Sequence, residues 1–265
     1  MKAKRGIDFV KDILGQGRCS FTLDEASQAI GQRGQTLNMT LQRLKHDKWV
    51  VPFSQGFYLA LDVQHQPAGM LDPEWFVDEW ARFLGVEYYV GGLSAAALHG
   101  AAHQHPIAFQ VFLNRVVRSV NKGGLRVDVF YKRAIPSAAV ERRKCPAGYF
   151  RISNPELTAY DLIAYERCCP SVDLAATVYV ELGEAIDSVR LAALREQGAR
   201  DAELQRVGWL LDQMGWKEKT TSLHEALSQS HLVWRALDRR LPASGERNDH
   251  WKVLVNTDVQ PDIER

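Results

Sequence analysis

Amide, hydroxyl and guanidinium side chains line one side of a helical repeat at residues 35–46. Leu37, Leu41 and Leu44 recur at helical spacing and predict a buried stripe on the other side. The free side then carries groups that hydrogen-bond to base edges in the DNA major groove and to phosphates. We expect this face to hold Gln35, Thr36, Asn38, Met39, Gln42 and Arg43, with Lys45, Lys48, Ser54 and Gln55 on the DNA backbone.

Several short elements would have to hold this helix in place. Apolar residues at helical spacing predict a first helix over residues 7–14, which glycines end. Thr22, followed three residues later by Glu25, forms a capping box that opens a short second helix. A glycine turn follows at residues 31–34. Two strands are expected at residues 49–51 and 56–59, around a turn at residues 52–55.

This order of elements predicts a winged helix-turn-helix over residues 1–62. The chain has 33 Lys and Arg against 32 Asp and Glu, a net charge of +1, so a nucleic-acid surface must be local. Residues 1–61 hold nine basic and five acidic residues, a difference of +4. A winged helix that contacts protein, or a solvated helical hairpin, are the alternative interpretations of this segment.

The rest of the chain indicates a second, larger domain of the α+β class. Residues 63–73 read as a linker, and residues 74–265 as a mixed α/β domain with a helical C-terminal part. Residues 74–153 are sheet-rich, with strands expected at 88–90, 109–113, 125–131 and 149–152. Residues 154–265 are mainly helical, including stretches at 204–214 and 223–237. A late strand at residues 251–256 is expected to complete the sheet.

A second group of basic residues falls within residues 115–133 of this larger domain. Such residues usually form a solvated surface, and the alternative is a surface for phosphates, RNA or a protein partner. This candidate second basic surface comprises Arg115, Arg118, Lys122, Arg126, Lys132 and Arg133.

A glycine turn after the strand at residues 88–90 raises the alternative of an enzyme. Nucleotidyltransferases open with such a turn and place two carboxylates on the next strand to hold Mg²⁺. Here the turn holds Gly91, Gly92 and Ser94, but the next expected strand has no acid and the one after it supplies only Asp128. We therefore expect no catalytic activity, a diverged nucleotidyltransferase being the alternative.

No other catalytic or metal site emerges from the residue pattern. His99, His103 and His105 have no Cys or carboxylate beside them to complete a metal shell. Ser94 and Asp161 lack the G-x-S-x-G turn of a hydrolase. The four cysteines form no C-x-x-C pair and suit reduced thiols in the cytoplasm. We expect no metal, no cofactor, no signal peptide and no membrane span.

Four motifs, taken in order, resemble the AbiEi-type antitoxins, the transcriptional-regulator partners in abortive-infection, type IV toxin–antitoxin systems. Each motif is short, and their order after a winged helix carries the resemblance. They are Gly56-Phe57-Tyr58; Tyr88-Tyr89-Val90-Gly91-Gly92-Leu93-Ser94-Ala95 with His99-Gly100; Ser153-Asn154-Pro155-Glu156-Leu157-Thr158-Ala159-Tyr160-Asp161-Leu162; and Trp251 with Val255-Asn256.

This resemblance implies a two-part protein. The winged helix would bind double-stranded DNA at inverted repeats and repress the promoter of its own operon. The C-terminal domain would neutralise a cognate nucleotidyltransferase-like toxin, without needing a stable complex with it. The remaining alternative is a stand-alone winged-helix regulator whose larger domain senses a ligand.

Overall fold

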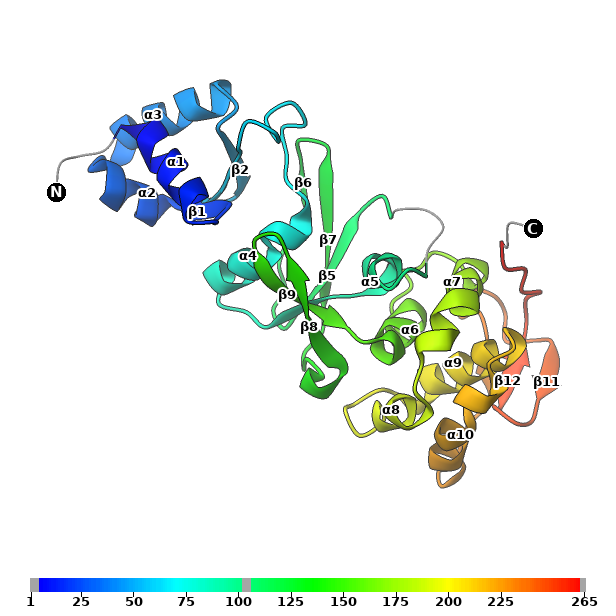
Figure 1. Cartoon of the computed structure of the whole chain (residues 1–265). Coiled ribbons are helices and arrows are strands. Elements are labelled where there is room, and N and C mark those ends of the chain that lie inside the picture. The colour runs from blue at the N-terminus through cyan, green and yellow to red at the C-terminus, as the bar shows by residue number, and fades with distance from the viewer. Residues whose placement is uncertain (1–4, 102–105, 263–265) are drawn as a thin grey trace. The chain divides into compact units, whose positions relative to one another are not determined.

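The computed structural model describes residues 5–101 and 106–262, which combine helices with three β-sheets (Figure 1). The predicted α+β class is therefore confirmed. The N-terminal elements are α1 (Gly6–Gly15), β1 (Ser20–Thr22), α2 (Leu23–Ile30), α3 (Gly34–His46), β2 (Val50–Ser54) and β3 (Phe57–Ala60).

The three N-terminal helices enclose a hydrophobic core of their own. Apolar side chains of α1 and α2 meet the buried leucines of α3, together with Phe21, Val50 and Ala60 from the strands. The predicted capping box is present: the Glu25 N–H donates to Thr22 Oγ1 at 3.2 Å, and the Thr22 N–H donates to Glu25 Oε2 at 2.7 Å. Gly31 ends α2 with a φ of 71°, a conformation that favours glycine.

A small antiparallel sheet of order β1-β3-β2 follows these helices. The expected turn at residues 52–55 is wrong in its position. Pro52 and Phe53 belong to β2, and the turn consists of Gln55 and Gly56. Phe53 is pulled into the strand because its ring is buried against other aromatic rings. β1 was not expected from the sequence, since three residues carry no measurable alternation.

The middle of the chain forms a six-stranded sheet of order β6-β7-β5-β4-β9-β8. All four expected strands are confirmed, and the strands β6 and β8 are additional. The elements of this region are η1 (Pro73–Trp75), α4 (Val77–Leu84), β4 (Tyr88–Val90), α5 (Gly92–Leu98), β5 (Phe109–Leu113), β6 (Val120–Lys122), β7 (Leu125–Tyr131), η2 (Ser137–Ala139), β8 (Val140–Cys145) and β9 (Gly148–Ser153).

The C-terminal part is mainly helical, as expected, but two of its details differ from expectation. The helix predicted over residues 223–237 ends at Ser228, and Arg235–Ala236 is a strand. The late strand joins a separate sheet of order β10-β12-β11 and does not extend the six-stranded one. The elements are α6 (Pro155–Ala164), α7 (Val172–Ala185), α8 (Ser188–Ala193), α9 (Asp201–Gln213), η3 (Lys217–Lys219), α10 (Thr221–Ser228), β10 (Arg235–Ala236), β11 (Glu246–Asn248) and β12 (Val253–Val255).

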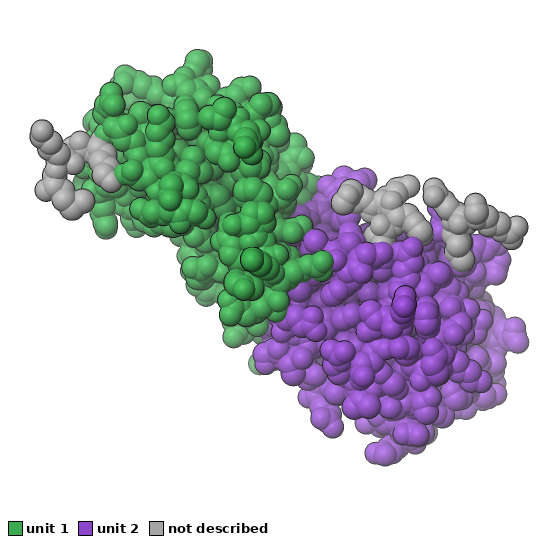
Figure 2. Space-filling model, viewed as in Figure 1, with its two compact units in different colours: residues 1–88, 112–133, 142–151 green, residues 89–111, 134–141, 152–265 purple. Residues whose placement is uncertain are grey.

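The chain divides into two compact units, which Figure 2 colours separately. Unit 1 combines residues 1–88, 112–133 and 142–151, and unit 2 combines residues 89–111, 134–141 and 152–265. Residues 63–73 lie inside unit 1, where His65 stacks edge-on against Trp75 at 4.9 Å between ring centroids. The domain boundaries expected at residues 62 and 73 stay a prediction. Among the described residues, no helix is long and apolar enough to cross a membrane.

Candidate nucleic-acid interface

Helix α3 has one buried and one exposed face, as the leucine spacing predicts. Leu37, Leu41 and Leu44 are buried in the N-terminal core. Every residue expected to contact DNA from this helix is exposed, and the exposed fraction of Met39 is 50%. These exposed residues are Gln35, Thr36, Asn38, Met39, Gln42, Arg43 and Lys45.

The turn between α2 and α3 is fixed by side-chain hydrogen bonds. Thr40 Oγ1 donates to Gln32 Oε1 at 2.7 Å, and Ser27 Oγ donates to the Gln32 carbonyl at 2.8 Å. Helix α1 also lies close against α3. A Cβ at Gly6 would meet Thr40 Cγ2 at 2.7 Å. The exposed face of α3 is thus presented on a helix whose start and buried side are both held in place.

The β2–β3 hairpin supplies the remaining expected backbone contacts. Lys48 and Gln55 are exposed at its two ends. Lys48 adopts a φ of 59°, which is uncommon for a residue with a side chain. Ser54 is only half-buried, but its hydroxyl accepts a hydrogen bond from Trp80 Nε1 at 3.1 Å. Ser54 is therefore the candidate least free to meet a phosphate.

The hairpin is attached to α4 through contacts between aromatic rings. The Phe53 ring lies 4.7 Å from Phe76 and 5.2 Å from Trp80, measured between centroids, and Phe57 lies 5.4 Å from Phe83. Edge-on aromatic pairs of this kind add about 0.5–1.5 kcal/mol each beyond the burial of their surface.

A polar cluster strengthens the attachment of β1 to α4 within unit 1. Arg18 forms ion pairs with Glu25 at 2.9 Å and with Glu79 at 3.4 Å, and the Ser20 hydroxyl donates to Glu79. Burial alone would raise the pKa of Glu25. The Thr22 N–H and the Arg18 guanidinium outweigh it and lower that pKa. Glu25 therefore stays ionised and keeps both the cap and the ion pair.

The candidate second basic surface is only partly available. Arg115 donates to the Leu84 carbonyl at 2.7 Å, Arg126 pairs with Asp128 at 3.0 Å, and Lys132 lies over the Phe112 ring. Arg118, Lys122 and Arg133 are exposed.

Sequence reasoning missed a further basic run in unit 1. Arg142, Arg143 and Lys144 are all exposed on β8, which is the sheet edge opposite β6. The signal was a charged run between Val140 and Cys145, and charge at this density is typical of an edge strand.

The glycine turn before α5 is occupied by the protein's own side chains. Gln110 is 4% exposed; its Oε1 accepts from the Leu93 N–H at 2.7 Å, and its Nε2 donates to the Cys168 carbonyl at 2.8 Å. Gly92 has a φ of +59°, and a Cβ there would lie 2.0 Å from Cys168 Sγ. The position where the next strand would present a carboxylate thus holds an amide that closes the turn.

The other residues weighed for chemistry have structural partners. Ser94 Oγ accepts from the Gln110 N–H at 2.9 Å, and Asp161 accepts from the Tyr89 hydroxyl at 2.7 Å. His99 Nε2 is 2.8 Å from the Ser153 carbonyl, while His103 and His105 lie outside the described residues. Across residues 5–101 and 106–262, no group of three or more His, Cys, Asp or Glu could hold a metal ion.

Comparison with known proteins adds two findings. The chain is similar in fold to the RV2827C protein from Mycobacterium tuberculosis, with a TM-score of 0.66 over 95% of this chain and 92% of that chain. The two are 15% identical, so the likeness shows a shared fold alone. A search of curated proteins gives no match.

The second finding is a family match over the middle of the chain. Residues 89–213 match the family model described as the AbiEi antitoxin C-terminal domain. The matched segment contains most of the Gly-Gly motif and all of the Asn-Pro-Glu motif. The first and last of the four motifs lie outside it. The match of residues 89–213 confirms the resemblance to AbiEi-type antitoxins carried by the ordered motifs.

Proposed function

We propose that the protein is a DNA-binding autorepressor and the antitoxin of a type IV toxin–antitoxin system. In this proposal residues 1–62 are a winged helix-turn-helix. The element order α1-β1-α2-α3-β2-β3 and the antiparallel order β1-β3-β2 support it. Helix α3 would enter the major groove, and the β2–β3 hairpin would be the wing.

The exposed face of α3 is the observation that carries this proposal. Arg43, Gln42, Asn38 and Gln35 would reach base edges, because guanidinium and amide groups pair with guanine and adenine there. Lys45, Lys48 and the wing residue Gln55 would contact phosphates. The leucines on the buried side fix which groups of α3 face outward.

Fluorescence anisotropy on DNA from upstream of the gene, against a scrambled fragment of equal length, tests this proposal. We expect a preference of about 10³ or more for the upstream fragment, with affinity falling steeply as salt rises. Equal, weak binding to both fragments would remove sequence-specific DNA recognition and favour a winged helix that contacts protein.

The antitoxin part of the proposal rests on residues 89–213. This domain would neutralise a nucleotidyltransferase-like toxin in the cytoplasm without catalysing a reaction. Co-expression with a nucleotidyltransferase-like toxin, taken from a neighbouring gene where one is present, tests it: the full chain should restore growth. A chain carrying Arg43→Ala should restore growth equally well when expressed from an independent promoter. Failure of the unaltered chain to rescue growth would overturn the antitoxin assignment.

An enzyme is the second candidate, because the glycine turn before α5 resembles that of nucleotidyltransferases. Gln110 argues against it, since its side chain fills the turn and bonds the backbone N–H that a phosphate would need. An assay for Mg²⁺-dependent nucleotide incorporation decides between the two. Incorporation above that of a heat-denatured sample would reinstate the enzyme.

A further inference from the structure

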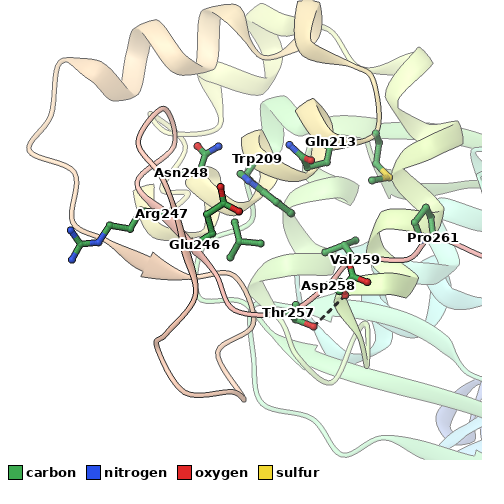
Figure 3. Close-up of a pocket in the computed structure, with 11 residues that line it drawn as sticks. Trp209, Gln213, Glu246, Arg247, Asn248, Thr257, Asp258, Val259 and Pro261 are labelled. Atoms are coloured by element: carbon green, nitrogen blue, oxygen red, sulfur yellow. Dashed lines mark hydrogen bonds between the residues drawn. The ribbon is translucent and has the colours of Figure 1, made fainter.

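Unit 2 contains a cavity of about 550 Å³ near its C-terminal sheet (Figure 3). Its walls come from the end of α9, from β11 and β12, and from residues 257–261. Hydrogen bonds hold the last wall in place: the Gln260 N–H donates to Asp173 Oδ1 and the Asp262 N–H to Thr177 Oγ1, both at 2.9 Å. The volume lies within the roughly 300–1,000 Å³ of small-molecule sites. Most of the lining residues follow the family-matched segment.

One wall is an almost fully buried tryptophan whose N–H is unused. Trp209 is 5% exposed, yet its Nε1 has no acceptor among the described residues. By contrast, Trp251 Nε1 donates to Asp212 at 2.8 Å and Trp216 Nε1 to the Val180 carbonyl at 3.3 Å. Figure 3 shows the Trp209 nitrogen on the side of the ring toward Glu246 and Asn248. Trp209 Nε1 is not one of the buried side-chain nitrogens that lack a partner, so it is open to the cavity, and a ligand there that carries an acceptor would pair with it.

The charge of the cavity lining is negative. Glu246 and Asp258 contribute two carboxylates at its exposed rim; Glu246 forms no ion pair within the described part of the chain, and Asp258 Oδ2 accepts from Gln260 Nε2 at 2.7 Å. The one basic lining residue, Arg247, is turned away: its guanidinium lies over the Trp234 ring at 5.3 Å, and Figure 3 shows it pointing out of the cavity. A cation entering the cavity would therefore meet two carboxylates without competition from Arg247.

We propose that this cavity binds a ligand with a guanidinium or ammonium group, a short carbon stem and a neighbouring carbonyl. The cation lies between Glu246 and Asp258, the stem packs on the Trp209 ring and Val255, and the carbonyl accepts from Trp209 Nε1. An arginine side chain with its own amide has this chemistry. It can come from a free metabolite or from a peptide segment of a partner protein.

Titration of the full chain with N-acetyl-L-arginine amide tests the site, with the neutral isostere N-acetyl-L-citrulline amide as control. The readout is the indole N–H resonance of Trp209 in a ¹⁵N-correlation spectrum, assigned from its loss in Trp209→Phe. We expect saturable binding of the arginine compound and at least about tenfold weaker binding of the citrulline compound. Absence of a saturable shift, or equal shifts from both compounds, overturns the proposal.

Variants test whether the two carboxylates bind the ligand, while the protein stays folded. The double variant Glu246→Gln, Asp258→Asn should weaken binding at least about tenfold, because both charges are lost. Asp249→Asn is the matched control: Asp249 lies in the β11–β12 connection, pairs with Lys252 at 2.8 Å and does not line the cavity. Unaltered binding in the double variant would overturn the proposal. Retention of the remaining indole resonances shows that each variant is folded.

The source of the ligand follows from two further probes. Agmatine offers the cation without a carbonyl, and a blocked Gly-Gly-Arg-Gly-Gly peptide offers both within a chain. Binding of the peptide at least as tight as that of the amino-acid amide assigns the site to a partner's arginine. Binding of the amide with exclusion of the peptide assigns it to a free metabolite. Measured by titration calorimetry, because the variant lacks the reporting indole N–H, Trp209→Phe should weaken binding of both carbonyl compounds about three- to tenfold and leave that of agmatine unchanged.

Discussion

The exposed face of α3 and the glycine turn before α5 both carry motifs associated with binding, but they differ in what their polar groups already contact. On α3, residues such as Gln42 and Arg43 extend from a helix whose opposite side is buried. At the turn, Gln110 and Cys168 occupy the space next to Gly92; Gln110 accepts from the Leu93 N–H and donates to the Cys168 carbonyl. The comparison teaches that a motif indicates a site only when its groups still lack partners within the fold.

The largest effect is expected from adding a methyl group at the filled turn. Gly92→Ala should lower the free energy of unfolding by about 3 kcal/mol, because it combines a positive φ with a contact at 2.0 Å. Urea denaturation followed by circular dichroism measures this. Gly85→Ala is the control, since Gly85 has a φ of +64° but no heavy atom within 4 Å of an added Cβ, and should cost about 1 kcal/mol. Equal losses would mean that the turn is not filled.

Removing one guanidinium from the exposed face of α3 should weaken DNA binding and leave the stability of the protein unchanged. Arg43→Ala should weaken binding to the upstream DNA by about 1–3 kcal/mol, if the side chain meets a guanine edge. Anisotropy and thermal unfolding measure the two quantities on the same sample. Arg167→Ala, an exposed arginine of unit 2, should change neither. A loss of stability in Arg43→Ala would indicate that the Arg43 side chain contributes to folding and is not free for DNA.

A smaller change in DNA binding is expected at Lys48, just beyond the exposed face of α3. Lys48→Gln should weaken binding to specific and scrambled DNA alike and reduce the slope of log affinity against log salt by about 1. The salt series that establishes binding also measures this slope. A loss confined to the upstream fragment would instead place Lys48 on a base edge.

The smallest effect on stability is expected at a pair of stacked histidines in unit 2. His224 and His250 stack with centroids 3.8 Å apart, and burial, followed by the charge of His224, lowers the pKa of His250 below 6.5. Asp212 acts in the opposite direction and Lys217 in the same one. The unfolded chain therefore takes up a proton more readily than the folded protein as the pH falls through 6.5.

Stability that is present above pH 6.5 should thus be lost below it, by less than about 1 kcal/mol because His250 is largely exposed. Urea midpoints between pH 8 and pH 5 measure the loss. His250→Phe retains a flat ring without titrating and should reduce the dependence. An unchanged dependence would assign it to other groups.

Sequence reasoning succeeded where a local pattern determines a structure. Leu37, Leu41 and Leu44 fix the buried side of α3, and Asn154 caps α6 by accepting from the Leu157 N–H at 2.9 Å. It failed for strands such as β8 and β11, which have no alternation and depend on partners distant in the chain. Likewise, the bond between Ser54 and Trp80 joins residues 26 positions apart, and the cavity joins α9 to β11. No local pattern encodes such contacts.

The edge-on packing of Phe53 against Phe76 and Trp80 has a genetic consequence. Phe53 belongs to the β2–β3 hairpin, and Phe76 and Trp80 belong to the start and middle of α4, against which the hairpin packs. Under the proposed function, mutations there will impair folding together with repression, so they cannot separate repression from antitoxin activity. A screen for alleles that lose repression but still protect cells should therefore recover changes on the outward side of α3, and almost none in these aromatic residues.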